Sequence, residues 1–268
     1  MTTTANVMRN EVTLSYGKVR YLEAGTGAPV VLLHGVAAAG GADDWRPSMA
    51  VLSKNFKVLA PDMLTWPPSD TREGVDAFPN LTDFVREFQD GLGLSKSHVI
   101  GATMGGWIAG LFAYESPSRV DKLVLTGNPG FHGGRADRLA EWQIPPDETV
   151  HDQLMRMMDG VPEAEAAALV QEKITKLHEE GFGEAFQGTM KTMSNPDNRI
   201  RYNLMRRLPV TPVPMLFVLG RGDPSSEIAD QLQVAAPTAK VHIVEEGAHQ
   251  VHYENVEEFC RVVTEFLS

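Results

Sequence analysis

The segment that organises the chain lies near its middle and reads Val99-Ile100-Gly101-Ala102-Thr103-Met104-Gly105-Gly106-Trp107. Apolar residues typical of a buried strand run directly into the pattern G-x-T-x-G-G, and a helical stretch follows. This is the form of a nucleophile elbow, G-x-S-x-G, with threonine in the place of serine. Glycines are needed on both sides of residue 103, because larger side chains would collide with neighbouring backbone in so tight a turn. The alternative is a glycine-rich turn that only allows close packing.

The elbow predicts two functional groups. It would raise the Thr103 hydroxyl above the end of a sheet as a candidate nucleophile. The backbone N–H of Met104, at the N-terminus of the following helix, would point at any oxyanion that develops there. A second N–H is expected from the loop after Leu32-Leu33-His34-Gly35, given by Val36 or by one of the alanines just after it. His34 is expected to shape this loop rather than to transfer protons.

Two further segments supply an acid and a base. Asp223 ends the motif G-R-G-D after an apolar run, where a carboxylate can orient a histidine, although an aspartate beside Pro224 is also common in ordinary turns. His249 ends the motif E-G-A-H after the last apolar run, and an imidazole there can accept a hydroxyl proton. His252 is a rival for that role. The order nucleophile, acid, histidine is that of one of the common triad classes, and it predicts that Thr103, Asp223 and His249 act together.

Short apolar runs bounded by glycine, proline or aspartate predict a mostly parallel sheet, since continuous apolar runs suit central strands buried on both faces. The expected strands are Glu11–Tyr16, Lys18–Glu23, Val30–Leu33, Phe56–Ala60, His98–Ile100, Lys122–Thr126, Met215–Leu219 and Val241–Val244. The first two, separated by Gly17, predict a hairpin. Helical stretches between the others indicate βαβ units with helices on both faces. A last amphipathic helix is expected at Asn255–Leu267, where Asn255 and Glu258 have capping-box spacing.

One interval breaks this alternation. Residues 131–208 show no convincing strand, while Pro162–Glu180 is strongly helical and stops at Gly181. An all-helical block between two core strands predicts a lid inserted over the carboxyl end of the sheet. The expected organisation is therefore a core of residues 1–130 and 209–268 with a helical lid, or cap, of residues 131–208.

The amino-acid composition and net charge exclude some classes of binding partner. Of 268 residues, 43% are hydrophobic and 22% are charged, which is ordinary for a globular protein, and the net charge of −11 argues against nucleic acid or an anionic membrane surface. Cys260 is the single cysteine, the N-terminus lacks the apolar segment of a secretory signal, and no apolar run is long enough to span a bilayer. We therefore expect a cytoplasmic protein whose partner is a small-molecule substrate. The sequence does not fix the oligomeric state, and a homodimer is one alternative. No motif with metal-ligand spacing and no G-x-G-x-x-G motif is present, so neither a metal nor another cofactor is expected.

The chain resembles the α/β-hydrolase superfamily over essentially its whole length. Besides the elbow and the triad order, the match includes Pro61-Asp62 after a predicted strand and Ser69-Asp70 beyond it. Within the superfamily the chain is most similar to the meta-cleavage-product hydrolases, which split a carbon–carbon bond in dienoates. That similarity rests on Met104-Gly105-Gly106, on the run from Leu123 to Gly130, and on the length and lid position. The resemblance implies an α/β-hydrolase fold and a cofactor-independent hydrolase.

The chain departs from the meta-cleavage-product pattern at four positions. Ala102 and Thr103 replace the Asn and Ser of the elbow G-N-S-M-G-G. Lys173 stands where the family's lid carries an arginine that binds the substrate's carboxylate, and Gln250 stands where an aromatic commonly follows the histidine. The resemblance therefore implies Lys173 and Gln250 as substrate-binding candidates. The expected substrate is a small, partly apolar carbonyl compound: an ester, a lactone or a vinylogous diketone acid.

The threonine at the elbow is compatible with three interpretations of the protein's function. In the preferred interpretation Thr103 attacks a carbonyl and the protein is a hydrolase. In the alternative, Thr103 only donates a hydrogen bond, and His249 acts as general base in a lyase or dehydratase reaction. A third interpretation is a ligand-sensing pseudoenzyme that has kept the fold and lost turnover. The β-branched side chain motivates the alternatives, because it fits the strained elbow backbone less well than serine does.

Overall fold

An eight-stranded sheet forms the centre of the computed structural model, which describes residues 7–15, 17–36, 41–63, 78–127, 130–131, 141, 143–157, 162–179 and 181–268. The strand order is β1-β2-β4-β3-β5-β6-β7-β8. The strands are β1 (Met8–Leu14), β2 (Gly17–Ala24), β3 (Ala28–Leu33), β4 (Phe56–Pro61), β5 (Ser97–Ala102), β6 (Val120–Thr126), β7 (Met215–Gly220) and β8 (Lys240–Val244). Every predicted strand is present, with its ends shifted by a few residues.

The strand directions explain where a site can form. β1 and β2 make the predicted antiparallel hairpin, with Gly17 at a φ of 132°. β2 is also antiparallel to β4, whereas the other neighbouring strands pair in parallel. The sheet is therefore mostly parallel, as predicted. The carboxyl ends of β3, β5, β7 and β8 meet at one edge, which is where open α/β sheets bind their ligands.

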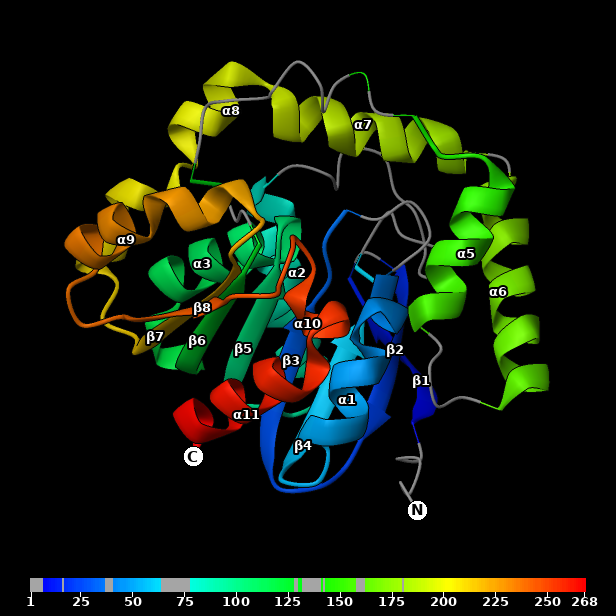
Figure 1. Cartoon of the computed structure of the whole chain (residues 1–268), viewed down its shortest axis with the longest axis horizontal. Coiled ribbons are helices and arrows are strands. Elements are labelled where there is room, and N and C mark those ends of the chain that lie inside the picture. Colours follow the sequence, from blue (N-terminus) through cyan, green and yellow to red (C-terminus); the bar gives the residue numbers. More distant parts are fainter. Residues whose placement is uncertain are drawn as a thin grey trace.

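Helices cover both faces of the sheet (Figure 1). One face carries α2 (Phe78–Gly91), α3 (Met104–Glu115) and α9 (Ala229–Ala235), and the other carries α1 (Arg46–Leu52), α10 (Val251–Glu254) and α11 (Val256–Leu267). Each face has its own buried apolar cluster, which gives the sheet the two covered sides that its continuous apolar strands require. The chain thus has the predicted α/β-hydrolase fold. Short 3-10 helices occupy Gly41–Trp45 (η1), Pro117–Arg119 (η2), Leu204–Arg206 (η3), Leu208–Val210 (η4) and Pro224–Ile228 (η5).

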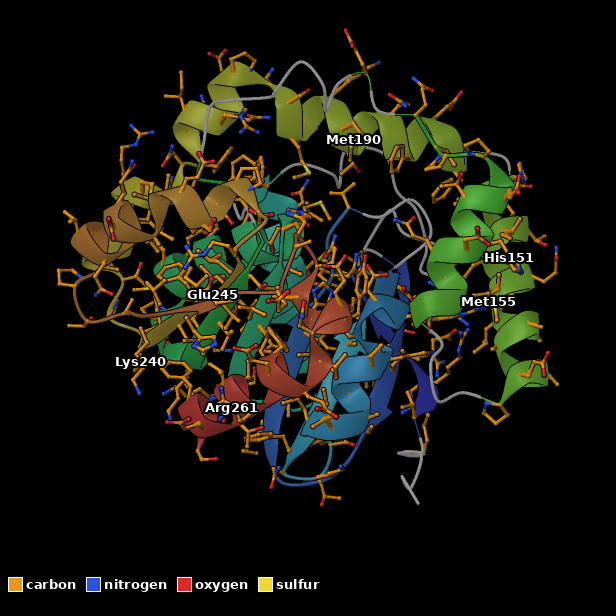
Figure 2. The ribbon with its side chains drawn as sticks, in the orientation of Figure 1. His151, Met155, Met190, Lys240, Glu245 and Arg261 are labelled. Atoms are coloured by element: carbon orange, nitrogen blue, oxygen red, sulfur yellow. The ribbon has the colours of Figure 1, made fainter. Side chains whose placement is uncertain are left out.

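The described part of residues 131–208, predicted as a lid, contains helices and turns and no strand. Its helices are α5 (Asp147–Met157), α6 (Glu163–Leu177), α7 (Phe182–Ser194) and α8 (Pro196–Arg201). In Figure 1 α7 and α8 pass above the carboxyl ends of the strands, and α5 and α6 descend beside β1. α6 ends before Gly181, whose φ of 88° starts the turn into α7. Buried side chains of this layer, among them Met190, join the core cluster beneath it, while Met155 is partly buried (Figure 2).

The predicted capping box at the last helix is wrong. Asn255 precedes α11 but its side chain makes no capping hydrogen bond. Its backbone N–H, which Glu258 would have accepted, already donates to Val251 O at 3.0 Å and closes α10. The Glu258 carboxylate instead binds His242 Nε2 on β8 at 2.8 Å. The spacing was present, but the preceding helix had used the donor that a capping box needs.

Candidate active site

Thr103 occupies the turn between β5 and α3 in the strained geometry that an elbow requires. Its φ is 49°, and no other non-glycine residue in the described part of the chain has a positive φ. A Cβ placed on Gly101 would lie 2.4 Å from Gly105 O, and one on Gly105 would lie 2.1 Å from Leu33 O. The glycines are therefore required by backbone contact. Such a conformation costs about 1–3 kcal/mol, which a fold retains where the surroundings enforce it, as happens at active sites.

The two branches of the Thr103 side chain face different walls. A Cβ on Gly35 would lie 2.1 Å from Thr103 Oγ1, so the hydroxyl faces the loop after β3. A Cβ on Gly127 would lie 2.8 Å from Thr103 Cγ2 and 3.3 Å from His249 Cε1, so the methyl group lies on the side of the histidine. No hydrogen bond joins Thr103 Oγ1 to His249, both of which are described. Glycine at position 127 leaves the room that the methyl group and the imidazole share.

His249 and Asp223 form a hydrogen-bonded pair at the ends of β8 and β7. The Nδ1–H of His249 donates to Asp223 Oδ2, and the Asp223 residue is 2% exposed. Ser225 donates its backbone N–H to Asp223 Oδ1 at 2.6 Å and its hydroxyl to the same oxygen. Burial alone would raise the pKa of Asp223, but the hydrogen bonds from His249 and Ser225 outweigh it and hold that pKa below its usual value. An ionised, oriented carboxylate fixes the tautomer that leaves His249 Nε2 free to take a proton.

His252, the rival histidine, lies elsewhere. It is 1% exposed, and its ring packs against Trp45 with centroids 4.3 Å apart. Burial, followed by the charge of nearby His249, lowers the pKa of His252 to about 3, so this ring is neutral in the folded protein. The structure pairs Asp223 with His249 and places His252 among aromatic side chains.

The loop after β3 is shaped by His34, as expected. Met63 N–H donates to His34 Nε2 at 3.0 Å, and His34 Nδ1 lies 2.8 Å from Gly35 O. Burial lowers the pKa of His34 to about 4, so the neutral ring accepts at one nitrogen and donates at the other. This ring thereby ties the loop beside Thr103 to the end of β4.

The predicted oxyanion donors flank that loop and the elbow. Met104 begins α3 immediately after Thr103, and half-buried Val36 follows Gly35. The alanines at positions 37–39, the alternative donors, lie outside the described residues, as does Ser69-Asp70. The oxyanion role of Met104 and Val36 stays a prediction.

The two predicted substrate-binding residues, Lys173 and Gln250, have different surroundings. The Lys173 side chain reaches from α6 to Asp43, with Nζ 2.9 Å from Oδ2, and it is buried. Gln250 precedes α10 directly after His249, and its backbone N–H donates to Glu254 Oε2 at 3.2 Å. Gln250 is thus beside the histidine, whereas the Lys173 ammonium already has a carboxylate partner.

Two residues around these side chains were not predicted from the sequence. Ser225 holds Asp223, and the D-P-S pattern after β7 could have indicated it, because aspartate commonly accepts a hydrogen bond from the backbone N–H two residues on. No sequence pattern pointed to Asp43, because its partner Lys173 lies on α6, far away in sequence.

No group of three or more His, Cys, Asp or Glu residues is placed to hold a metal ion in the part of the chain that the structure describes. Cys260 is buried, and burial raises the pKa of its thiol to about 12, which makes it an unreactive core residue. Among the described helices, none combines the length and the apolar character that crossing a bilayer requires.

Comparisons with known proteins identify the family of the chain. The family model described as "Alpha/beta hydrolase family" matches residues 30–262. A 2-hydroxy-6-oxononadienedioate/2-hydroxy-6-oxononatrienedioate hydrolase of Paraburkholderia xenovorans (strain LB400) is 29% identical over 271 residues, covering 94% of this chain and 91% of its own. A 2-hydroxy-6-oxo-2,4-heptadienoate hydrolase of Pseudomonas putida is 28% identical, covering 92% of this chain and 91% of its own.

The solved structures agree on the fold. A 2-hydroxy-6-oxo-6-phenylhexa-2,4-dienoate hydrolase from Rhodococcus sp. strain RHA1 superposes with a TM-score of 0.80 at 20% sequence identity, covering 98% of this chain and 99% of its own. At that identity the likeness concerns the arrangement of helices and strands, and both chains match over nearly their full lengths.

Proposed function

Because the chain belongs to the alpha/beta hydrolase family and is an enzyme of the hydrolase class, we propose that it hydrolyses a carbon–carbon bond in a 2-hydroxy-6-oxo-dienoate acid. No cofactor takes part in this proposal. The observation that carries it is the His249–Asp223 pair beside Thr103, whose backbone has the strained elbow geometry. The named activities of the relatives support the substrate class, since several act on 2-hydroxy-6-oxo acids of this type.

The proposed reaction uses the triad in two stages. In the first, His249 Nε2 takes the Thr103 hydroxyl proton while Oγ1 attacks the keto carbon, and the Met104 and Val36 N–H groups receive the oxyanion. Before this attack the substrate's 2-hydroxyl proton has moved to the chain carbon beside the keto group, which gives the vinylogous diketone, and the bond between that chain carbon and the keto carbon then breaks. Its electron pair passes into the conjugated system, His249 returns the proton to the departing fragment, and an acyl-Thr103 ester is left. In the second stage, water attacks this ester with His249 as base, and a carboxylic acid leaves.

One observation favours a second candidate. The Thr103 methyl group and His249 Cε1 both lie beside Gly127, whereas the hydroxyl faces Gly35 and makes no hydrogen bond to His249. If this arrangement persists with substrate bound, Thr103 donates a hydrogen bond to the carbonyl, and His249 removes a proton directly in a lyase or dehydratase reaction. We favour hydrolysis because hydrogen bonds of a catalytic group often form only in the complex with substrate.

Turnover of 2-hydroxy-6-oxo-2,4-heptadienoate in ¹⁸O-labelled water tests the proposal. Hydrolysis predicts loss of the dienoate absorbance, with one ¹⁸O in the released acetate and none in the 2-hydroxydienoate fragment. Thr103→Ala and His249→Ala are the matched controls and should show neither change. A product without ¹⁸O would establish the second candidate.

A protein that the dienoate stabilises against heat without any turnover would be a ligand sensor, and this result would contradict both enzymatic candidates.

A further inference from the structure

We propose that Lys173 is a positioning residue that couples the lid to the oxyanion loop, defined here as residues 34–36. Its ammonium lies 2.9 Å from Asp43 Oδ2, and the two side chains are 9% and 4% exposed. Asp43 lies in η1, the next described element along the chain after the oxyanion loop, and Lys173 lies on the lid helix α6. An ion pair shielded from water in this way therefore joins two elements that are far apart in sequence.

Asp43 is the centre of a charged cluster. Arg46 Nε donates to its Oδ1, and Arg9 NH2 on β1 lies 3.4 Å from its Oδ2. Burial alone would raise the pKa of Asp43, but Lys173, Arg46 and Arg9 together hold it well below its usual value. Arg9 also reaches Glu172 of α6, with NH1 3.6 Å from Oε2. The lid helix is thus held to the core through two neighbouring residues of opposite charge.

The cluster connects to the loop beside Thr103 through the end of β4. Asp62 Oδ1 accepts the backbone N–H of Ala42 at 2.8 Å, and the next residue, Met63, donates to His34. A Cβ on Gly41 would lie 2.3 Å from Asp62 Oδ1 and 3.7 Å from Lys173 Nζ. The Lys173 ammonium therefore lies close to the backbone that leads out of the oxyanion loop.

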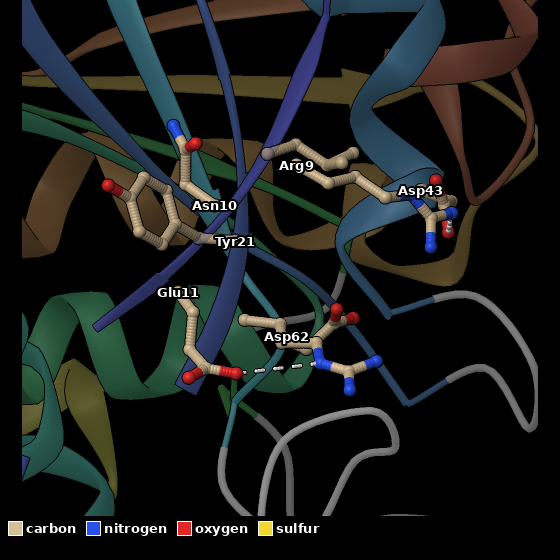
Figure 3. Close-up of a pocket in the computed structure, with 8 residues that line it drawn as sticks. Arg9, Asn10, Glu11, Tyr21, Asp43 and Asp62 are labelled. Atoms are coloured by element: carbon tan, nitrogen blue, oxygen red, sulfur yellow. Dashed lines mark hydrogen bonds and ion pairs between the residues drawn. The ribbon is translucent and has the colours of Figure 1, made fainter. Parts of the chain in front are cut away.

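Figure 3 shows one side of this arrangement, where Arg9 extends from β1 towards Asp43 and Asp62 lies below it. All three line a cavity of about 420 Å³ at the edge of the sheet.

A residue at this position in the resembled family would contact the substrate's carboxylate. Lys173 has instead a buried counter-ion of its own, and moving it to a substrate would leave the Asp43 carboxylate short of one of its three cations. Uncompensated buried charge is strongly unfavourable, so the ammonium stays with Asp43 when substrate binds. Its contribution to the reaction then comes from fixing the loop that carries the Val36 N–H. This catalytic part of the inference rests on the proposed function.

Paired substrates distinguish positioning from substrate binding. Lys173→Met should lower kcat about tenfold to a hundredfold, for the anionic dienoate and for a neutral activated ester alike, with KM changed little. Asp43→Asn should do the same, and the double variant should be no worse than either single one, because both act through one contact. Lys173→Arg should restore most of the activity, and Lys191→Met, an exposed lysine of α7, should have none of these effects. A large rise in KM confined to the anionic substrate, with kcat unchanged, would overturn the proposal.

Hydrogen exchange gives a readout that does not depend on turnover. In Lys173→Met and in Asp43→Asn, amide exchange should rise together in residues 162–179 of the lid and residues 41–45 of the core, with β5 and β7 unaffected. If the wild-type protein turns over neither substrate, the proposed function fails while this measurement still tests the coupling. Unchanged exchange in both segments, in variants that keep the wild-type circular dichroism, would contradict it.

Discussion

Among the individual residues, Thr103 decides the chemistry, because its hydroxyl acts either as a nucleophile or only as a hydrogen-bond donor. Its backbone has the positive φ of an elbow, and its β-branched side chain has a hydroxyl that faces Gly35 and a methyl group that faces Gly127. Oγ1 makes no hydrogen bond to His249, so forming one with His249 Nε2 requires the Thr103 side chain or the imidazole to move. Threonine rotates about χ1 between discrete staggered wells, so a movement on its side is a change of rotamer.

The first prediction separates the two neighbouring histidines. His249→Ala should lower turnover by roughly three to six powers of ten, because it removes the proton acceptor that Asp223 orients. His252→Ala should leave the chemical step nearly intact and lower the melting temperature, because it opens a cavity against Trp45. Rates and thermal unfolding of both variants decide between the histidines. A severe loss of turnover in His252→Ala, together with a mild one in His249→Ala, would reverse the assignment.

The second prediction concerns Asp44, beside Asp43 in η1. Asp44 is 2% exposed and its Oδ1 has no hydrogen-bond partner, and burial, opposed by Lys173, raises its pKa to about 7. The folded state therefore holds this proton more tightly than the unfolded chain does, and stability falls as pH rises from about 4 to about 7. Asp44→Asn removes the titration, so it should stabilise the protein at pH 8 by on the order of 1–3 kcal/mol, and less at pH 5.

Urea unfolding of wild type and Asp44→Asn at the two pH values measures this difference. Equal effects at pH 5 and pH 8, or a variant that is less stable at pH 8, would show that the Asp44 carboxylate is not a buried, poorly compensated charge.

Some of the candidate site residues could be predicted from the sequence and others could not. The positions of Thr103, Asp223 and His249 could be predicted because each follows an apolar strand in a short glycine-containing motif, and the structure joins the last two by a hydrogen bond. The direction of the Thr103 hydroxyl could not be predicted, because it depends on Gly35 and Gly127 from other strands. Lys173 was placed by resemblance alone, and its partner Asp43 is set by how α6 packs beside β1.

Among the helices and strands, local sequence patterns predicted an element best where the pattern lies wholly within that element. The apolar runs predicted all the strands, and the strand-free interval predicted helices α5 to α8. The capping box failed because Asn255 serves two elements at once: its N–H closes α10 before α11 begins. Two adjacent helices can compete for the same backbone donor. A sequence pattern within one helix does not contain information about this competition.

The third prediction belongs to the lid. We expect limited proteolysis of the native protein to cut within residues 131–208 before the sheet, because a layer of short helices has lower local stability than a covered sheet. Bound substrate or product should slow this cleavage, since it bridges the lid and the core. Mapping of the first fragments by mass spectrometry checks both points. First cuts confined to the chain termini, with rates that ligand does not change, would count against a lid that opens.

At the scale of the whole molecule, the fold brings together side chains that the sequence scatters. β3, β5, β7 and β8 each deliver one part of the candidate site to the same edge, namely the oxyanion loop, Thr103, Asp223 and His249. Helices α7 and α8 pass over this edge, and α6 joins the core through Lys173 and Glu172. In the proposed function these parts serve as nucleophile, base, acid and covering layer around one reaction volume, which is what acyl transfer requires.

The covalent role of Thr103 is the claim on which the proposed reaction depends. Thr103→Ser keeps the hydroxyl and removes the methyl group, which lies with His249 beside Gly127, so it should preserve or raise hydrolysis. A residue that only donates a hydrogen bond would instead lose its fixed rotamer, and the native reaction would slow.

The most direct test is the intact mass of wild-type protein, acid-quenched during turnover of an activated ester and then digested to locate any adduct. We predict a mass increase equal to the acyl group on the peptide that contains Thr103, absent from Thr103→Ala and larger in Thr103→Ser. An unmodified wild-type protein at every quench time, while the ester is being consumed and Thr103→Ser accumulates the adduct, would contradict a threonine nucleophile.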